Sequence, residues 1–140
     1  MSDLRKLRAL DARERRVLAA AACLLPLVSM ALKVTSLKRT AGLMRAFERR
    51  RAARPLPASA IARLTGIAAR RGAPGASCIV RSMVLRTLLA RHGHASELHF
   101  GARKEGGRLM AHAWVECEGR ALLESPADAY PAFARARRAS

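Results

Sequence analysis

Two adjacent stretches decide the fold: SCIVRSMVLRTLLARHG, residues 77–93, and SELHFGARKEGGRLMAHAWVECEGRALLE, residues 96–124. In the first, apolar residues recur at helical spacing on more than one face, which predicts a central buried helix ending at Gly93. In the second, the period changes to alternation between apolar and polar residues. That pattern predicts strands over residues 96–103, 108–117 and 121–124, joined by turns at 104–107 and 118–120.

An apolar run over residues 17–32 precedes these stretches. Asp11 and Glu14 form a capping-box pattern at its start, and Pro26 should end or kink the helix. The run is shorter than the roughly 20 residues that span a bilayer, and it has no clear signal-peptide cleavage site. We expect a buried or partner-facing helix; a membrane-surface helix and an anchor are the alternatives.

The remaining residues complete a helices-first layout. Helical spacing predicts helices over residues 36–51 and 58–71, and a charged segment ending in two prolines lies between them. The tail, residues 125–140, shows little pattern. We expect an α+β fold with a helical N-terminal extension over residues 1–57 and a core over residues 58–140.

The chain is strongly basic, with 27 basic and 10 acidic side chains among 140 residues and a net charge of +17. The charge is spread along the whole chain. It fits either a GC-rich genome or an acidic partner. Aromatic residues make up only 4% of the sequence, which argues against a base-stacking platform and thus against nucleic-acid binding.

The three cysteines, Cys23, Cys78 and Cys117, are odd in number and widely spaced. This spacing predicts neither a disulfide framework nor a zinc site, and it suits a reducing cytoplasm. His92, His94 and His99 lie close in sequence, but no thiolate or paired carboxylate completes a metal site. The glycines of the 104–107 segment fall between strands and indicate a hairpin turn, not a phosphate-binding loop. We therefore expect no metal or cofactor.

Two residues stand out as candidates for chemistry. Cys78 is expected in the first turn of the central helix, where free N–H groups and a partial positive charge favour a thiolate and can stabilise an oxyanion. His112 lies between small residues in a predicted strand, with Trp114 on the same face. Histidine is the usual general base for a thiol. Taken alone, each residue could instead be structural.

A catalytic histidine needs an acidic orienting group. If residues 118–120 form a three-residue loop, paired positions in the hairpin sum to 238, and Glu124 becomes a diagonal neighbour of His112. A two-residue loop would move Glu124 to the other face. Asp128 is the second candidate, and Glu116 shares the face of His112 four residues along.

The helix starting at Ser77-Cys78, the strand pair from Glu97 and the segment Ala111-His-Ala-Trp-Val-Glu116 together resemble the transglutaminase-like leader peptidases of lasso-peptide biosynthesis. The resemblance is strong over residues 58–126. It implies a papain- or transglutaminase-like core, with a Cys-bearing helix packed on a small antiparallel sheet. By position, Cys78 matches the nucleophile and His112 the base. The third residue of the family is Asp, and Glu124 falls at that position.

The resemblance implies a cytoplasmic cysteine protease that removes the leader from a ribosomally made precursor, before a separate ATP-dependent cyclase closes the ring. Residues 1–57 are too short and too helical for the leader-recognition domain of the larger forms. The implied partners are therefore the precursor peptide, a separate leader-recognition protein and the lasso cyclase. The N-terminal helix could add contact with the inner membrane.

Two other functions fit the same sequence. One is an acyl transferase that passes the acyl group from Cys78 to an amine. The other is a non-enzymatic basic module that docks on a membrane or on nucleic acid, which predicts an unreactive Cys78 and salt-sensitive binding.

Overall fold

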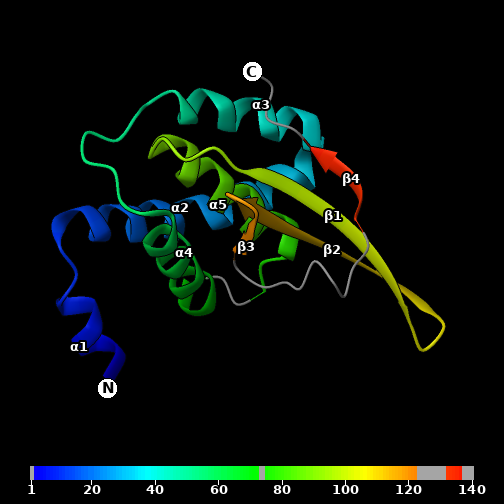
Figure 1. Ribbon diagram of the computed structural model, residues 1–140, viewed down its shortest axis with the longest axis horizontal. Coiled ribbons are helices and arrows are strands. Elements are labelled where there is room, and N and C mark those ends of the chain that lie inside the picture. The colour runs from blue at the N-terminus through cyan, green and yellow to red at the C-terminus, as the bar shows by residue number, and fades with distance from the viewer. Residues whose placement is uncertain (1, 73–74, 123–131, 137–140) are drawn as a thin grey trace.

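The computed structural model describes residues 2–72, 75–122 and 132–136 (Figure 1). Across them the helices come first and an antiparallel sheet follows, so the α+β prediction is confirmed. The helices are α1 (Ser2–Arg8), α2 (Ala12–Val34), α3 (Leu37–Glu48), α4 (Ala58–Gly72) and α5 (Cys78–Arg91). The strands are β1 (Glu97–Glu105), β2 (Arg108–Cys117), β3 (Arg120–Leu122) and β4 (Ala132–Ala136).

The central helix of the fold is α5. It packs against α2, α3 and α4 and also against β1 and β2 (Figure 1). Its side chains from Val84 to Ala90 are buried apart from Arg86, and Leu85 and Leu89 are fully buried. A helix that is apolar on several sides needs partners on several sides. The prediction that this is the most enclosed helix is confirmed.

Helix α2 runs from Ala12 to Val34 without ending at Pro26, contrary to one of the outcomes expected from the sequence. A proline inside a helix leaves the carbonyl four residues earlier without its donor. Here Pro26 and Ala22 both lie on the exposed face of α2, so this carbonyl is not sealed in the core. The capping box that begins the helix is present, with Asp11 Oδ1 accepting from the Glu14 amide at 2.8 Å.

The two long faces of α2 differ in their surroundings. One face, formed by Val17, Ala21, Leu25 and Val28, is buried against α4 and α5. The outer face leaves Leu27, Met30 and Val34 exposed by 64%, 63% and 74%. By length and composition α2 could cross a membrane: its most apolar window has a mean hydropathy of 2.2 and is 22% buried. A core helix passes the same test.

The strand order in the sheet is β3-β2-β1-β4, and all neighbouring strands are antiparallel. Two-residue turns close both hairpins. Gly106 and Gly107 have φ values of 55° and 80°, and Glu118 and Gly119 have 53° and 78°. Positive φ at both central positions defines the turn type that fits the right-handed twist of the strands. The β1–β2 hairpin extends well beyond the helices (Figure 1).

Strand β4 was not expected, because the tail shows little sequence pattern. It pairs with the outer edge of β1, where Leu98 lies opposite Ala136 and Phe100 opposite Ala134. Pairing between segments this far apart is a tertiary property that local periodicity does not report.

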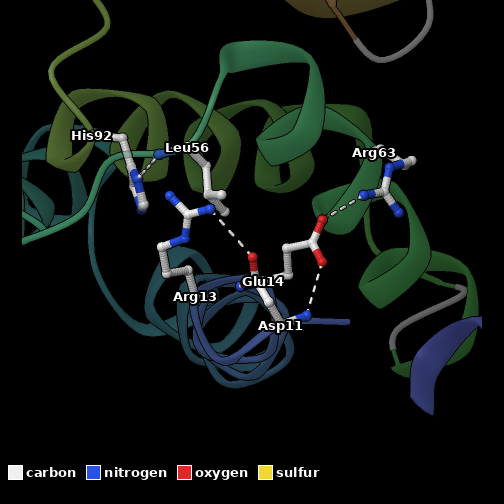
Figure 2. A network of polar contacts seen from close by, with 6 residues as sticks. All are labelled: Asp11, Arg13, Glu14, Leu56, Arg63 and His92. Carbon is white, nitrogen blue, oxygen red and sulfur yellow. Dashed lines mark hydrogen bonds and ion pairs between the residues drawn. The ribbon is translucent and has the colours of Figure 1, made fainter. Parts of the chain in front are cut away.

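The segment between α3 and α4 is fastened to the C-terminal end of α5 by four hydrogen bonds. Arg91 Nε donates to Arg50 O at 2.8 Å, and the Ala52 amide donates to Arg91 O at 2.9 Å. The Leu56 amide donates to His92 Nδ1 at 2.9 Å, and His94 Nε2 lies 2.7 Å from Leu56 O. Figure 2 shows the contact between His92 and Leu56. The division of the chain at residue 57 stays a prediction.

Candidate active site

Cys78 is the first residue of α5 and is half-buried. Ser77 caps the helix, and its hydroxyl accepts from the Val80 amide at 3.4 Å. A cap of this kind occupies one amide of the first turn, while the neighbouring amides keep no partner within the helix. The placement of the thiol in the first turn, predicted from the sequence, is therefore present in the structure.

A buried hydrogen bond fixes α5 against the sheet next to His112. Ser82 Oγ donates to the carbonyl of Ala113 at 3.1 Å. Ser82 follows Cys78 by four residues, so the two lie on the same side of the helix, roughly 6 Å apart along its axis. Ala113 follows His112 directly in β2. The first turn of α5 and this part of β2 are thus held in register with each other.

His112 lies on β2 opposite Gly101 of β1 and is half-buried. Its ring stacks on that of Trp114, with centroids 6.1 Å apart and planes inclined by 20°. The expectation that these two side chains share a face is confirmed. Glycine at the opposing position places no side chain across from the imidazole.

The same face of the sheet continues into a second histidine that the sequence did not single out for chemistry. His99 lies opposite Trp114 and stacks on it with centroids 5.7 Å apart, so three rings lie in a row. His99 is 2% exposed, and its Nε2 lies 2.9 Å from Glu116 Oε2 and 3.3 Å from Glu97 Oε2. Neither contact has the geometry of a hydrogen bond, and each becomes an ion pair only when the imidazole is protonated.

Glu116, one of the alternative acids, therefore approaches His99. A sequence signal for this cluster existed: once Gly106-Gly107 is taken as a two-residue turn, His99 falls opposite Trp114. Ser82 carried a similar signal, since a small polar residue one turn after Cys78 can face the sheet.

The expected register between β2 and β3 is wrong. Cys117 pairs with Arg120 and Val115 with Leu122, so paired positions sum to 237 across the two-residue turn at Glu118 and Gly119. The arithmetic that made Glu124 a diagonal neighbour of His112 assumed a three-residue loop and no longer supports that placement. Glu124 and Asp128 themselves lie outside the described residues, so the identity of the acid stays a prediction.

The other two cysteines have different surroundings. Cys117 is buried, and its Sγ donates to Ala95 O at 3.5 Å. Burial, and secondly the charge of Glu118, raises the pKa of the Cys117 thiol, which disfavours the nucleophilic thiolate. Cys23 is exposed in the middle of α2, away from any helix start. Of the three cysteines, Cys78 has the position best suited to a nucleophile.

A helix with a cysteine in its first turn, packed on an antiparallel sheet that carries a histidine, defines the papain- and transglutaminase-like class of folds. The chain belongs to the transglutaminase-like superfamily, whose profile matches residues 21–138. This superfamily includes cysteine proteases and acyltransferases. No curated protein and no solved structure matches the chain significantly.

Proposed function

We propose that the protein is a cysteine peptidase that removes the leader from a ribosomally made lasso-peptide precursor. The observation that carries the proposal is that Cys78 begins helix α5, and that Ser82 bonds this helix to the backbone of β2 one residue after His112. The superfamily supports thiol-dependent acyl chemistry, and the sequence resemblance supplies the substrate class.

In the proposed reaction, His112 takes the proton of the Cys78 thiol, and the resulting thiolate attacks the carbonyl at the end of the leader. Amides of the first turn of α5 stabilise the resulting oxyanion. His112 gives a proton to the leaving amine, which becomes the new N-terminus of the core peptide. Water then hydrolyses the thioester, with His112 accepting its proton, and free thiol and leader carboxylate are restored. Glu124 is our candidate for orienting His112, with Asp128 second.

The reaction would take place in the cytoplasm, with the precursor presented by a separate leader-recognition protein and the product passed to the lasso cyclase. The exposed outer face of α2 would then contact one of these partners or the inner membrane. The proposed chemistry uses side chains, backbone amides and water, and it requires no cofactor.

The test is leader cleavage followed by mass spectrometry, with a lasso precursor, a leader-recognition partner and either wild-type protein or Cys78→Ala. Cys23→Ala is the matched control, because it removes an exposed thiol elsewhere in the same chain. We expect Cys78→Ala to abolish cleavage and Cys23→Ala to leave it unchanged.

Cleavage that survives Cys78→Ala in a folded protein would rule out the thiol mechanism. Adding an amine nucleophile to the same assay distinguishes the peptidase from the alternative function, an acyl transferase. If the leader appears as its amide adduct in place of the free carboxylate, the protein is an acyl transferase.

A further inference from the structure

A second feature of the molecule lies at the end of α5 that is remote from Cys78. There, a cavity of about 360 Å³ opens between α2, the segment before α4 and the last turn of α5. Six of its lining residues are basic: Arg13, Arg16, Arg51, Arg54, Arg91 and His92. The others are apolar, including Val17 and Leu88, and no carboxylate lines it among the described residues. It is a strongly electropositive cavity with apolar surface between the cations.

Few acidic groups neutralise these arginines. Arg13 lies 3.3 Å from Asp11, and both side chains are about half exposed, so this ion pair is weak. No ion pair of Arg16, Arg51 or Arg54 occurs within the described part of the chain. Figure 2 shows the guanidinium of Arg13 extending from α2 toward Leu56 and His92.

One wall of the cavity is held in place before any ligand arrives. The four hydrogen bonds between residues 50–56 and the end of α5 fix the backbone that carries Arg51 and Arg54. A preorganised wall lowers the entropy lost when a ligand binds. Burial, and secondly the charges of Arg91 and His94, lowers the pKa of His92, which favours its neutral form.

We propose that this cavity binds an acidic segment of the peptide substrate, through carboxylate groups held by the arginines. Guanidinium groups bind carboxylates with paired hydrogen bonds, and apolar surface between them suits the aliphatic parts of a peptide. This proposal rests on the proposed peptidase function, since it assigns a binding site to the same substrate.

The distance between the cavity and Cys78 predicts where the acidic segment lies in the substrate. The 14 residues of α5 separate the cavity from Cys78 by roughly 20 Å, at 1.5 Å per residue. An extended peptide covers that span with about six residues, at 3.3 Å per residue. The acidic segment should therefore lie at least six residues from the cleaved bond.

The test measures binding with the full chain carrying Cys78→Ala, so that no cleavage is needed. A fluorescently labelled peptide with three glutamates is titrated by anisotropy at physiological salt, beside the same peptide with three glutamines. Arg16→Gln with Arg54→Gln removes two charges from the cavity. Arg39→Gln with Arg45→Gln removes two charges from exposed positions on α3, so both double variants have the same net charge.

With all arginines in place, we expect the protein to bind the glutamate peptide at least tenfold more tightly than the glutamine peptide. The cavity double variant should lose this preference, and the α3 double variant should keep it within threefold. An equal loss in both pairs would mean general surface attraction and would overturn the proposal, as would equal binding of both peptides. Displacement of the peptide by inorganic pyrophosphate at micromolar concentration would reassign the cavity to phosphate. Thermal unfolding of both pairs checks that the fold is intact.

This experiment is independent of the test of the peptidase. If Cys78 is needed for cleavage but the glutamate peptide does not bind in the cavity, only the cavity proposal is refuted. Selective binding of the glutamate peptide without cleavage would leave the cavity as a peptide site and refute the peptidase.

Discussion

The two ends of α5 differ in how they are held. At the N-terminal end, Cys78 is half-buried, and a hydrogen bond from Ser82 to the sheet fixes the first turns. At the C-terminal end, four hydrogen bonds attach residues 50–56 to Arg91, His92 and His94. Among the described residues, the N-terminal end thus presents a half-buried thiol in its first turn, whereas the C-terminal end ties distant segments of the fold together.

Replacing His112 near the N-terminal end and His94 near the C-terminal end should give the largest difference between a catalytic and a structural role. We expect His112→Ala to slow leader cleavage by roughly 10²- to 10⁴-fold, the usual contribution of a general base. His94→Ala should lower the unfolding temperature but leave the cleavage rate of the folded protein unchanged, because the His94 ring bonds to Leu56 O at the end of α5 remote from Cys78. Equal loss of activity in both variants, measured by mass spectrometry, would contradict the division of roles.

Ser82→Ala should cost about 1–3 kcal/mol in the free energy of unfolding, since it leaves the buried carbonyl of Ala113 without this donor. Cleavage should also slow, because the first turn of α5 loses its fixed position beside β2. Thr65→Val is the control: it removes a buried hydroxyl whose bond to Ile61 O lies within α4. If Thr65→Val slows cleavage as much as Ser82→Ala, the positioning role of Ser82 is refuted.

At the opposite end, the guanidinium of Arg91 lies over the ring of Phe47, 4.3 Å from its centroid. Phe47→Leu should lower the free energy of unfolding by roughly 0.5–1 kcal/mol, the range of a partly exposed cation–π contact. Cleavage should not change. Leu43→Ala, at an exposed position of the same helix, should stay within about 0.5 kcal/mol of wild type in urea unfolding.

The smallest expected effect concerns pH. Because the pKa of His92 is lowered in the folded state, the unfolded chain binds more protons below the ordinary histidine value. The contribution of His92 to stability is therefore complete above that value, about 6.5, and is lost as the pH falls toward the folded pKa. His92→Asn keeps an acceptor for the Leu56 amide, and we expect it to flatten the dependence of the unfolding temperature on pH between 7.5 and 5.5, an interval set by the ordinary histidine value. An unchanged dependence would contradict this.

Much of this arrangement could be read from the sequence, because its signals are local. The apolar spacing of α5 and the alternation in β2 placed Cys78 and His112 on the correct elements. The capping box at Asp11 was predicted for the same reason: it depends on two residues three positions apart.

The predictions that failed had two kinds of cause. The register at Glu118 depended on the choice between a two- and a three-residue turn, which the sequence left open, whereas β4 depended on pairing between distant segments. Pro26 did not end α2, because packing of Val17 and Leu25 on one face outweighs a hydrogen bond lost on the exposed face. The acid that would orient His112 depends on the same register and could not be derived from spacing.

The packing of α2 has a consequence for synthesis of the protein. The buried face of α2 needs α4 and α5, and the ribosome must add 57 more residues after Val34 to reach Arg91, the last residue of α5. At about 5–20 residues per second, the ribosome takes roughly 3–11 seconds to deliver them. For that time both faces of an apolar 23-residue helix are open, so we expect nascent α2 to be held by a chaperone or a membrane surface until α5 emerges.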